Sequence, residues 1–279
     1  MIDLHVHSTA SDGTFTPAQL VALAEKSGVC AFALTDHDST DGIEESLDAA
    51  AKSNIQVIPG IELSTEYNEK EIHVVGLYID WKCPALVKQL THFRECRDNR
   101  NLKMAQRLAE EGFSISADAL YQMFPDCVLT RAHIARYLTE TGQVESISEV
   151  FDHYIGEGCK CYIDRPKVTP TEAVKLIHLA GGTAVLAHPC LYKMERSELI
   201  AMINEMKQEG LDGIEAIYSC NQGNDEEEFR ALAAQYHLLI SGGSDFHGSN
   251  KPDISLGTGK GNLHIPYEIL EKIQESRKK

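Results

Sequence analysis

VCAFALTDHDSTDG (residues 29–42) joins a continuous apolar run to a turn of polar residues that ends in one glycine. An apolar run without alternation is typical of a strand buried on both faces, as in a parallel sheet covered by helices. The turn places Asp36 and His37 directly after the end of that strand. The stretch therefore predicts an α/β fold with polar side chains gathered at the ends of its strands.

Strands and helices alternate on both sides of this stretch. The first helix is expected after Thr16, which forms a capping sequence with Pro17 and Gln19. Further helices are expected near 43–53, 170–180, 195–209 and 225–236. Further strands are expected at 55–63, 71–79, 183–188, 213–217 and 237–241. About seven such units at this spacing predict a parallel sheet closed into a barrel.

The alternation stops between about residues 86 and 165, where the sequence favours helices. A long helix is expected to end at Gly112, and shorter ones are expected in ADALYQMF (117–124), RAHIARYLTETG (131–142) and SISEVFDHYIGEG (146–158). We therefore expect two parts. They are a barrel formed by 1–85 and 166–279, and a helical insert at 86–165 that serves as a substrate cap.

Composition and charge limit the class of protein. Hydrophobic residues make up 43% and charged residues 24% of the 279 residues, which fits a globular chain. The start of the chain lacks the features of a signal peptide, no apolar run suits a membrane span, and eight cysteines occur without a CxxC pair, so we expect a cytoplasmic protein with reduced thiols. A net charge of −16 argues against a long nucleic acid as partner, although metal ions could still attract a small anion.

Histidines and carboxylates occur at or just beyond the C-terminal ends of the predicted strands, the barrel face on which active sites are built. His5 and His7 share one face of their strand, because side chains repeat every two residues, whereas His73 lies early in its strand. Each residue alone could be packed or solvated, but buried imidazoles and charges gathered in one place need partners or metals. The candidate ligands are His5, His7, Asp12, His37, Glu62, His73, His188, Asp245 and His247.

Nitrogen and carboxylate ligands without thiolates suit Mn, Zn or Fe, and a set of about nine suits three divalent ions. The histidines left out of the site are His92, His153, His178, His237 and His264.

Together, HVHSTASDGT (5–14), LTDHDSTDG (34–42), PGIE (59–62), His73, AHP (187–189) and SDFHG (244–248) resemble the PHP family of polymerase and histidinol phosphatase domains. The resemblance covers about 1–82 and 168–279. It implies a distorted (β/α)7 TIM-like barrel with a trinuclear metal centre. The ligands that it implies are His5, His7, Glu62 and Asp245 for the first metal, Glu62, His73 and His188 for the second, and Asp12, His37 and His247 for the third.

The helical insert is similar to that of a subgroup containing 3′,5′-nucleotide bisphosphate phosphatases and exonucleases acting on short RNA 5′ ends. LTRAHIARYL (129–138) and Lys160-Cys161-Tyr162 resemble phosphate-contacting segments of that subgroup. Arg131, which follows a possible N-cap at Thr130, can hold two phosphate oxygens. The substrate-binding residues expected on this basis are Arg131, His133, Lys160 and Tyr162.

These features predict a metal-dependent phosphoesterase whose nucleophile is a hydroxide bridging two metals. The expected catalytic residues are Glu62, Asp245, His247 and His133, and His133, His247 or a metal-bound water would protonate the leaving oxygen. We expect a small phosphorylated metabolite or nucleotide as substrate, either a 3′,5′-bisphosphate nucleotide or a short RNA 5′ end. Three alternatives stay open: a histidinol-phosphate-type phosphatase, a metal-dependent amidohydrolase acting on C–N bonds, and a non-catalytic module that binds metal and nucleotide for regulation.

Overall fold

The computed structural model describes residues 1–125, 128–164 and 168–278. Cys127 and the expected junction at 165–166 lie outside the described residues. The chain divides into two compact units, Met1–Lys88 with Lys167–Lys279, and Gln89–Pro166. The first unit contains a seven-stranded sheet, and the second contains a group of helices.

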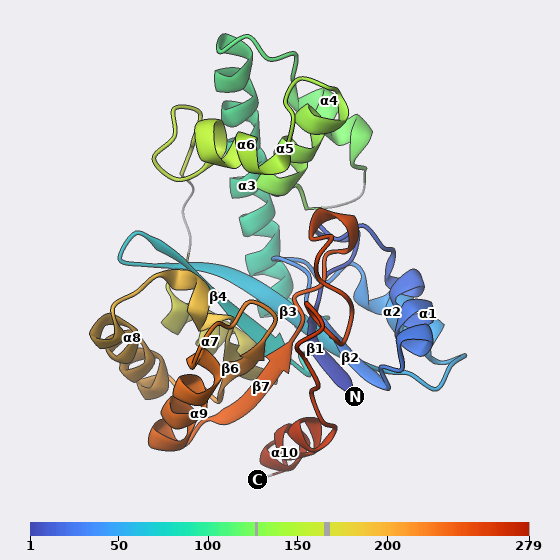
Figure 1. Ribbon diagram of the computed structural model, residues 1–279, viewed down its shortest axis with the longest axis vertical. Helices are drawn as coiled ribbons and strands as arrows, with labels where there is room; N and C mark the ends of the chain where they lie inside the picture. Colours follow the sequence, from blue (N-terminus) through green and yellow to red (C-terminus); the bar gives the residue numbers. More distant parts are fainter. Residues whose placement is uncertain (126–127, 165–167, 279) are drawn as a thin grey trace. The chain divides into compact units, whose positions relative to one another are not determined.

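The sheet of the first unit is a nearly closed barrel (Figure 1). Its strands neighbour one another in chain order: β1 (Ile2–Val6), β2 (Ala31–Leu34), β3 (Gln56–Tyr67), β4 (Lys70–Leu77), β5 (Thr183–Leu186), β6 (Gly213–Tyr218) and β7 (Leu239–Gly243). Val6 forms a parallel bridge with Phe246, just beyond β7, which brings the last strand against the first. The predicted α/β barrel is confirmed.

The prediction of a wholly parallel sheet is wrong at β4, which runs antiparallel to both β3 and β5. β3 and β4 form a hairpin, and Asn68 and Glu69 at its turn have φ values of 49° and 64°. Such a two-residue turn reverses the chain without a crossover helix. The beginning of β4 therefore lies at the barrel end where the parallel strands finish, which explains why His73 comes early in its strand.

The first helix begins as its sequence predicts. The Thr16 hydroxyl accepts the N–H of Gln19, the Gln19 side chain accepts the N–H of Thr16, and the helix ends at Gly28 with a φ of 69°. Helices α1 and α2 pack on each other and contact β2 and β3, α7 contacts β3, β4 and β5, α9 contacts β6 and β7, and α8 packs on α7 (Figure 1). Their bounds are α1 (Pro17–Ser27), α2 (Ile43–Ala50), α7 (Pro170–Leu179), α8 (Arg196–Gln208) and α9 (Asp225–Tyr236).

Three shorter elements complete the barrel unit. Two 3-10 turns, Pro189–Tyr192 and Gly248–Asn250, follow the ends of β5 and β7. The last helix, α10 (Glu268–Ser276), is absent from the sequence prediction, and it buries Ile269, Leu270 and Ile273 in the same core cluster as Ile2, Leu4 and Ala31.

The contact between the last and first strands requires a glycine. A Cβ added to Gly243 would lie 2.2 Å from the Cβ of His5, far inside van der Waals contact. Beyond this point the Asp245 N–H donates to the His5 carbonyl oxygen at 2.9 Å, and the His7 N–H donates to the Phe246 carbonyl oxygen at 3.0 Å. The close approach therefore fixes the segment after β7 against the end of β1.

The Gln89–Pro166 unit has a core of its own. It contains most of α3 (Pro84–Glu110), together with α4 (Ala117–Met123), α5 (Arg131–Glu140), α6 (Ile147–Val150) and a π-helical turn at Phe151–Ile155. Leu108, Leu120, Ile134, Leu138 and Ile155 are among its buried core residues. The predicted long helix is confirmed, and burial of one apolar face joins the shorter helices to it.

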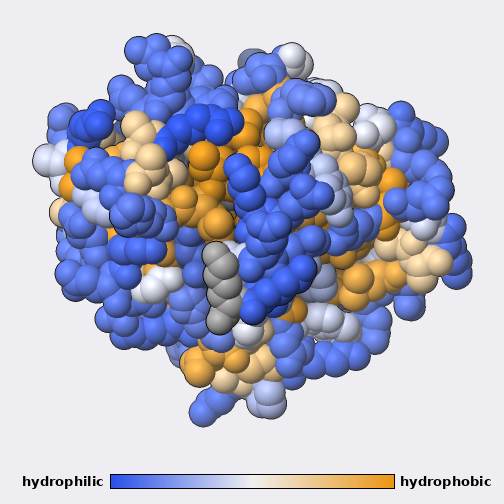
Figure 2. Space-filling view, turned by 90° about the horizontal axis from the view of Figure 1, so that it is seen from below, coloured by the Kyte–Doolittle hydropathy of each residue, from blue (hydrophilic) through white to orange (hydrophobic). Residues whose placement is uncertain are grey.

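The side of the molecule seen in Figure 2 is mainly hydrophilic, with hydrophobic patches scattered between polar side chains. Among the described residues, no helix combines the length and apolar character that crossing a bilayer requires.

Asp3 is expected to contribute strongly to the stability of the barrel. Its buried carboxylate accepts the Ser244 N–H at 2.8 Å, the Ser244 hydroxyl at 2.6 Å and the Gly257 N–H at 2.8 Å. Asp3→Ala would leave these donors unpaired, so the free energy of unfolding should fall by about 3 kcal/mol. Denaturant unfolding compared with Asp253→Ala, an exposed aspartate on the segment that carries Gly257, tests this. Equal midpoints for the two variants would contradict it.

Candidate metal centre

All nine predicted ligands come together at one end of the barrel. β1 supplies His5 and leads to His7, and the segments after β2, β5 and β7 supply others, while β3 and β4 carry one each. Their donor atoms form four groups within which the atoms lie no more than 4.8 Å apart. The groups are His7, Asp12, His37 and His247; His5, His7 and Asp245; His5, Glu62 and His188; and His37, Glu62 and His73.

Glu62 lies at the centre of the cluster and is fully buried. Its Oε1 is 2.9 Å from His73 Nδ1 and 2.9 Å from His188 Nε2. Its Oε2 is 3.0 Å from His37 Nδ1 and 3.2 Å from His7 Nε2. The two oxygens thus face different histidines, an arrangement suited to a carboxylate that connects two cations.

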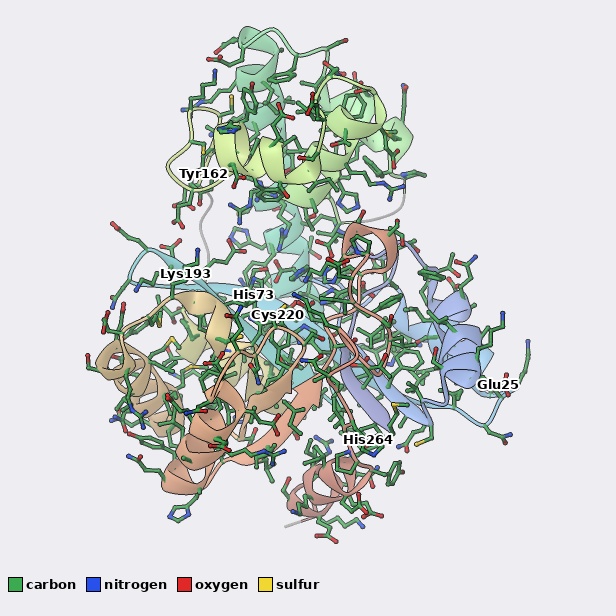
Figure 3. All side chains as sticks on the ribbon, in the orientation of Figure 1. Glu25, His73, Tyr162, Lys193, Cys220 and His264 are labelled. Atoms are coloured by element: carbon green, nitrogen blue, oxygen red, sulfur yellow. The ribbon has the colours of Figure 1, made fainter. Side chains whose placement is uncertain are left out.

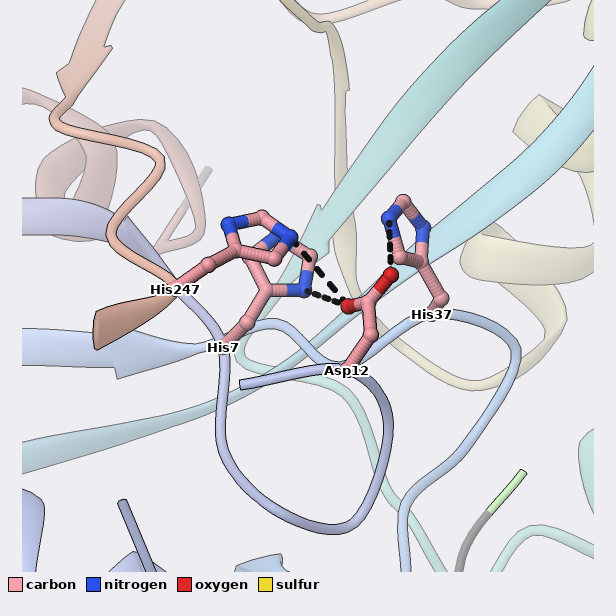
Figure 4. Close-up of side chains that lie close together, drawn as sticks. All are labelled: His7, Asp12, His37 and His247. Atoms are coloured by element: carbon pink, nitrogen blue, oxygen red, sulfur yellow. Dashed lines mark ion pairs between the residues drawn. The ribbon is translucent and has the colours of Figure 1, made fainter. Parts of the chain in front are cut away.

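Asp12 lies close to a second set of histidines (Figure 4). Its Oδ1 lies 3.2 Å from His247 Nε2 and 3.8 Å from His7 Nδ1, and its Oδ2 lies 3.9 Å from His37 Nε2. The rings of His7 and His247 stack with their centroids 4.0 Å apart. His7 therefore belongs to this group as well as to the one around Asp245, whereas the sequence resemblance implied only the latter.

Two candidate ligands occupy strained backbone conformations. Asp245 has a φ of 58° and His188 a φ of 25°, both outside the range that L-residues usually adopt. Such strain persists only where surrounding contacts enforce it, and it clusters at functional sites.

Buried polar atoms without hydrogen bonds show that the residues fit metal ions. These atoms are His5 Nε2, both ring nitrogens of His7, His37 Nδ1, Glu62 Oε2 and His188 Nδ1. Buried polar atoms in native proteins are nearly always paired, so this concentration calls for a partner of another kind. Imidazole nitrogens and carboxylate oxygens are ligands for divalent transition metals, and the candidate ligands include no thiolate.

The buried carboxylates raise the pKa values of neighbouring histidines. Burial opposes a charged imidazolium, yet Asp245 and Glu62 raise the pKa of His7 to about 9, and Glu62 raises the pKa of His73 to about 10. Burial lowers the pKa of His37 to about 3. Near pH 7 the metal-free cluster therefore holds protons on His7 and His73, while His37 is neutral.

Metal binding should consequently release protons. A ligating imidazole must be neutral, and the raised pKa values of His7 and His73 keep both rings protonated near pH 7 without metal. Titrating metal-free protein with Mn²⁺ by calorimetry, in buffers of different ionisation enthalpy, should show proton release and an affinity that rises with pH between 6 and about 9. If the heat of binding did not depend on the buffer, no proton would be released, and the prediction that His7 and His73 lose protons on binding metal would be wrong.

Glu215, which was not predicted from the sequence, contacts two of the candidate ligands on the side away from the cluster. Its Oε1 lies 3.1 Å from His5 Nδ1, and its Oε2 accepts the backbone N–H of His188 at 2.7 Å. Because Glu215 contacts Nδ1 of His5, the other ring nitrogen, Nε2, points toward the ligand cluster. Carboxylates commonly orient metal-binding histidines in this way. The available signal was a single acidic residue within the otherwise apolar strand GIEAI (213–217).

Asp36 also has a structural role that its position at a strand end did not reveal. Its Oδ1 accepts the Ser8 N–H at 2.8 Å and the Ser11 hydroxyl at 2.6 Å, and its Oδ2 accepts the Ser8 hydroxyl at 2.7 Å. These bonds fix the turn that carries Asp12 into the cluster.

The four predicted substrate-binding residues all lie in the Gln89–Pro166 unit. Arg131 is the first residue of α5, whose N-cap is Thr130 as predicted. The guanidinium carbon of Arg131 lies 5.6 Å from the centre of the Tyr162 ring. His133 is buried, and its Nδ1 accepts the Thr130 N–H at 3.0 Å. This capping role was not predicted from the sequence.

Lys160 forms an ion pair with Glu111 and lies 5.1 Å from the centre of the Tyr154 ring. Its segment, Cys159 to Cys161, forms a turn.

Two unassigned histidines of the barrel unit have other surroundings. His264 lies on the C-terminal segment, well apart from His73 (Figure 3). His178 Nε2 lies 2.8 Å from Asp212 Oδ2 in a half-exposed pair.

Comparison with known families agrees with this geometry. The sequence pattern of the PHP domain matches residues 3–163. The chain belongs to the PHP domain family. It is 37% identical over 246 residues to a 5′-3′ exoribonuclease of Haemophilus influenzae, covering 88% of this chain and 89% of the relative. A 3′,5′-nucleoside bisphosphate phosphatase of Chromobacterium violaceum is 35% identical over 247 residues, covering 88% and 87%. The family predicted from the sequence motifs is confirmed.

Solved structures show the same fold. A candidate metal-dependent phosphoesterase from Bifidobacterium adolescentis superimposes with a TM-score of 0.87 at 29% identity, covering 99% of this PHP chain and 95% of the other. A structure from Chromobacterium violaceum, described as an amidohydrolase with bound sulfate and no metal, gives a TM-score of 0.88 at 33% identity, covering 99% and 96%.

Proposed function

We propose that this PHP protein is a metal-dependent phosphoesterase that hydrolyses phosphate esters of small nucleotides. The observation that carries the proposal is Glu62, a buried carboxylate whose two oxygens face different histidines within a cluster of nitrogen and carboxylate ligands. The names of the relatives, a bisphosphate phosphatase and an exoribonuclease, support phosphate esters as the substrate class.

The cluster would hold three divalent ions, either Mn, Zn or Fe. The proposed sets are His5, His7, Glu62 and Asp245; Glu62, His73 and His188; and Asp12, His37 and His247. The four groups of close donor atoms, two of which share Glu62, support several cations rather than one. Ions at such sites neutralise charge on phosphoryl oxygens and lower the pKa of water.

Residues of both units have proposed roles in the reaction. Glu62 and Asp245 would hold cations, and His247 would complete the set of ligands around Asp12. His133 would protonate the leaving oxygen from Nε2, because its Nδ1 accepts the Thr130 N–H and the ring proton of the neutral form is then on Nε2.

The helical Gln89–Pro166 unit is proposed to be the substrate cap. Arg131, held near the Tyr162 ring, would bind phosphate oxygens with its planar donors. Lys160 would assist, although its ion pair with Glu111 must then loosen.

The proposed substrates are 3′,5′-bisphosphate nucleotides and short RNA 5′ ends, not long nucleic acids. A net charge of −16 repels an extended polyanion, whereas a metal centre attracts a compact one. We place the protein in the cytoplasm, in keeping with its described cysteines, which are free thiols. Hydrolysis of C–N bonds remains the second candidate, favoured by the description of the Chromobacterium violaceum structure.

Product analysis separates these functions. Purified protein supplied with Mn²⁺ should release phosphate from adenosine 3′,5′-bisphosphate faster than from histidinol phosphate, and should release no ammonia from amides. Release of ammonia with no phosphate release would replace the phosphoesterase proposal with the amidohydrolase one.

Glu62→Gln should lose both bound metal and activity, because an amide is a poorer metal ligand than a carboxylate and one of its two polar atoms is a donor. We expect phosphate release to fall by more than the roughly 10- to 100-fold that follows loss of a residue supporting a metal ligand. Elemental analysis should find more than two metal equivalents in the wild type and fewer in the variant. Glu69→Gln, at the exposed tip of the same hairpin, is the matched control. Full metal content in Glu62→Gln would refute the connecting role.

Arg131→Ala should weaken binding of bisphosphate substrates. Loss of a charge-assisted contact made in both ground and transition states raises KM more than it lowers kcat, with about a 10- to 100-fold loss in kcat/KM. The loss should be larger for adenosine 3′,5′-bisphosphate than for AMP, with metal content unchanged. Arg136→Ala, on the same helix and paired with Glu140, is the control. Equal, small effects on both substrates would show that Arg131 does not bind phosphate.

A further inference from the structure

Lys251 is a positively charged residue beside the candidate metal centre, and it is not one of the proposed metal ligands. Its Nζ lies 2.5 Å from Asp245 Oδ2. The side chain of Asp245 is only 4% exposed, whereas that of Lys251 is 37% exposed. The lysine therefore reaches inward from the surface and ends beside a candidate metal ligand.

The two oxygens of Asp245 have separate surroundings. Oδ2 accepts the Tyr218 hydroxyl at 2.7 Å as well as the ammonium group of Lys251. Oδ1 lies 3.3 Å from His7 Nε2 and 3.3 Å from His247 Nδ1. Oδ1 is thus the oxygen placed to bind a cation, and Lys251 contacts the other oxygen of the same carboxylate.

The backbone around Lys251 is tied to the turn that carries Asp12. The Lys251 N–H donates to the Gly248 carbonyl oxygen at 3.1 Å. The Asn250 amide donates to the Asp12 carbonyl oxygen at 2.7 Å, and the Ser249 N–H donates to the Thr14 hydroxyl at 3.0 Å. These bonds hold the backbone of Lys251, and the contact with Asp245 holds its ammonium group. Both are present before any ligand arrives, which reduces the entropy lost on binding.

The charge balance around Lys251 would change when a divalent ion binds to Asp245. In the metal-free protein Lys251 neutralises Asp245, but a divalent ion on Oδ1 would neutralise the same carboxylate. The ammonium is then surplus positive charge near divalent ions, and an anion stabilises it there. An ammonium group has three donors, and the contact with Asp245 uses one of them.

Resting on the phosphoesterase function proposed above, we propose that Lys251 is a further substrate-binding residue, whose ammonium group binds the phosphate of a phosphate monoester at the metal centre. The ligand is a tetrahedral dianion that contacts both the divalent ions and the lysine. Asp245 connects the two, because one of its oxygens faces the cation position and the other holds Lys251.

Two measurements test this proposal, and the loss of Lys251 should weaken phosphate binding without weakening Mn²⁺ binding. Inhibition by inorganic phosphate measures anion binding, and calorimetric titration of metal-free protein with Mn²⁺ measures metal binding. In Lys251→Met the phosphate inhibition constant should rise about tenfold or more, because a charge-assisted hydrogen bond is lost. The Mn²⁺ affinity should stay equal or increase, because a positive charge has left the site.

Control variants separate this role from a structural one. Lys251→Arg keeps the charge and should hold phosphate more tightly than Lys251→Met, and Lys260→Met, an exposed lysine of the same C-terminal segment, should behave as wild type. A Lys251 that only stabilised its loop would lose phosphate and Mn²⁺ affinity together. If Lys251→Met does not fold, Lys251→Gln, which keeps a polar side chain, is measured in the same way.

The outcomes distinguish the two proposals. Wild-type protein that neither releases phosphate from nucleotides nor binds inorganic phosphate in the presence of Mn²⁺ overturns the phosphoesterase function. Active wild-type protein with an unchanged phosphate inhibition constant in Lys251→Met overturns the role of Lys251 alone. Weakened phosphate inhibition with undiminished Mn²⁺ affinity supports both.

Discussion

The burial of Glu62 among histidines is the constraint on which the rest of this barrel depends. A fully buried carboxylate costs several kcal/mol unless cations or donors surround it. The barrel meets that need by directing histidines from several strands toward its two oxygens. Reversal of β4 brings His73 to the same end of the barrel, and Gly243 lets β7 approach His5 closely enough to place Asp245.

A second set of buried acidic residues holds these ligands in position. Glu215 fixes His5 and the backbone of His188, Asp36 fixes the turn before Asp12, and Asp3 ties β1 to segments that follow β7. Their carboxylates accept hydrogen bonds from backbone and hydroxyl groups, so their burial is compensated locally. The ligand cluster is therefore organised before metal binds, and proton release rather than refolding should accompany metal uptake.

On the proposals above, recognition of the substrate would be divided between the metal centre and two basic side chains. The metal centre would attract any compact phosphate, whereas Arg131 in the helical unit would distinguish a nucleotide with two phosphates from one with a single phosphate. Lys251 adds a contact within the barrel itself, on the segment that also carries His247. Such a division would let a protein of net charge −16 bind a small anion in preference to a long one.

The sequence by itself determined the α/β class and the helices between about residues 86 and 165, because apolar runs and helix caps are local signals. It also predicted, as candidate ligands, the nine residues that the structure brings together. It did not determine the direction of β4, since a hairpin and a crossover both leave an apolar strand pattern. Nor did it identify Glu215, Tyr218 or Lys251, whose roles arise from partners far away in the chain or across a turn. Only the tertiary structure decided which oxygen of Asp245 faces the histidines and which faces the lysine, because barrel closure brings those groups together.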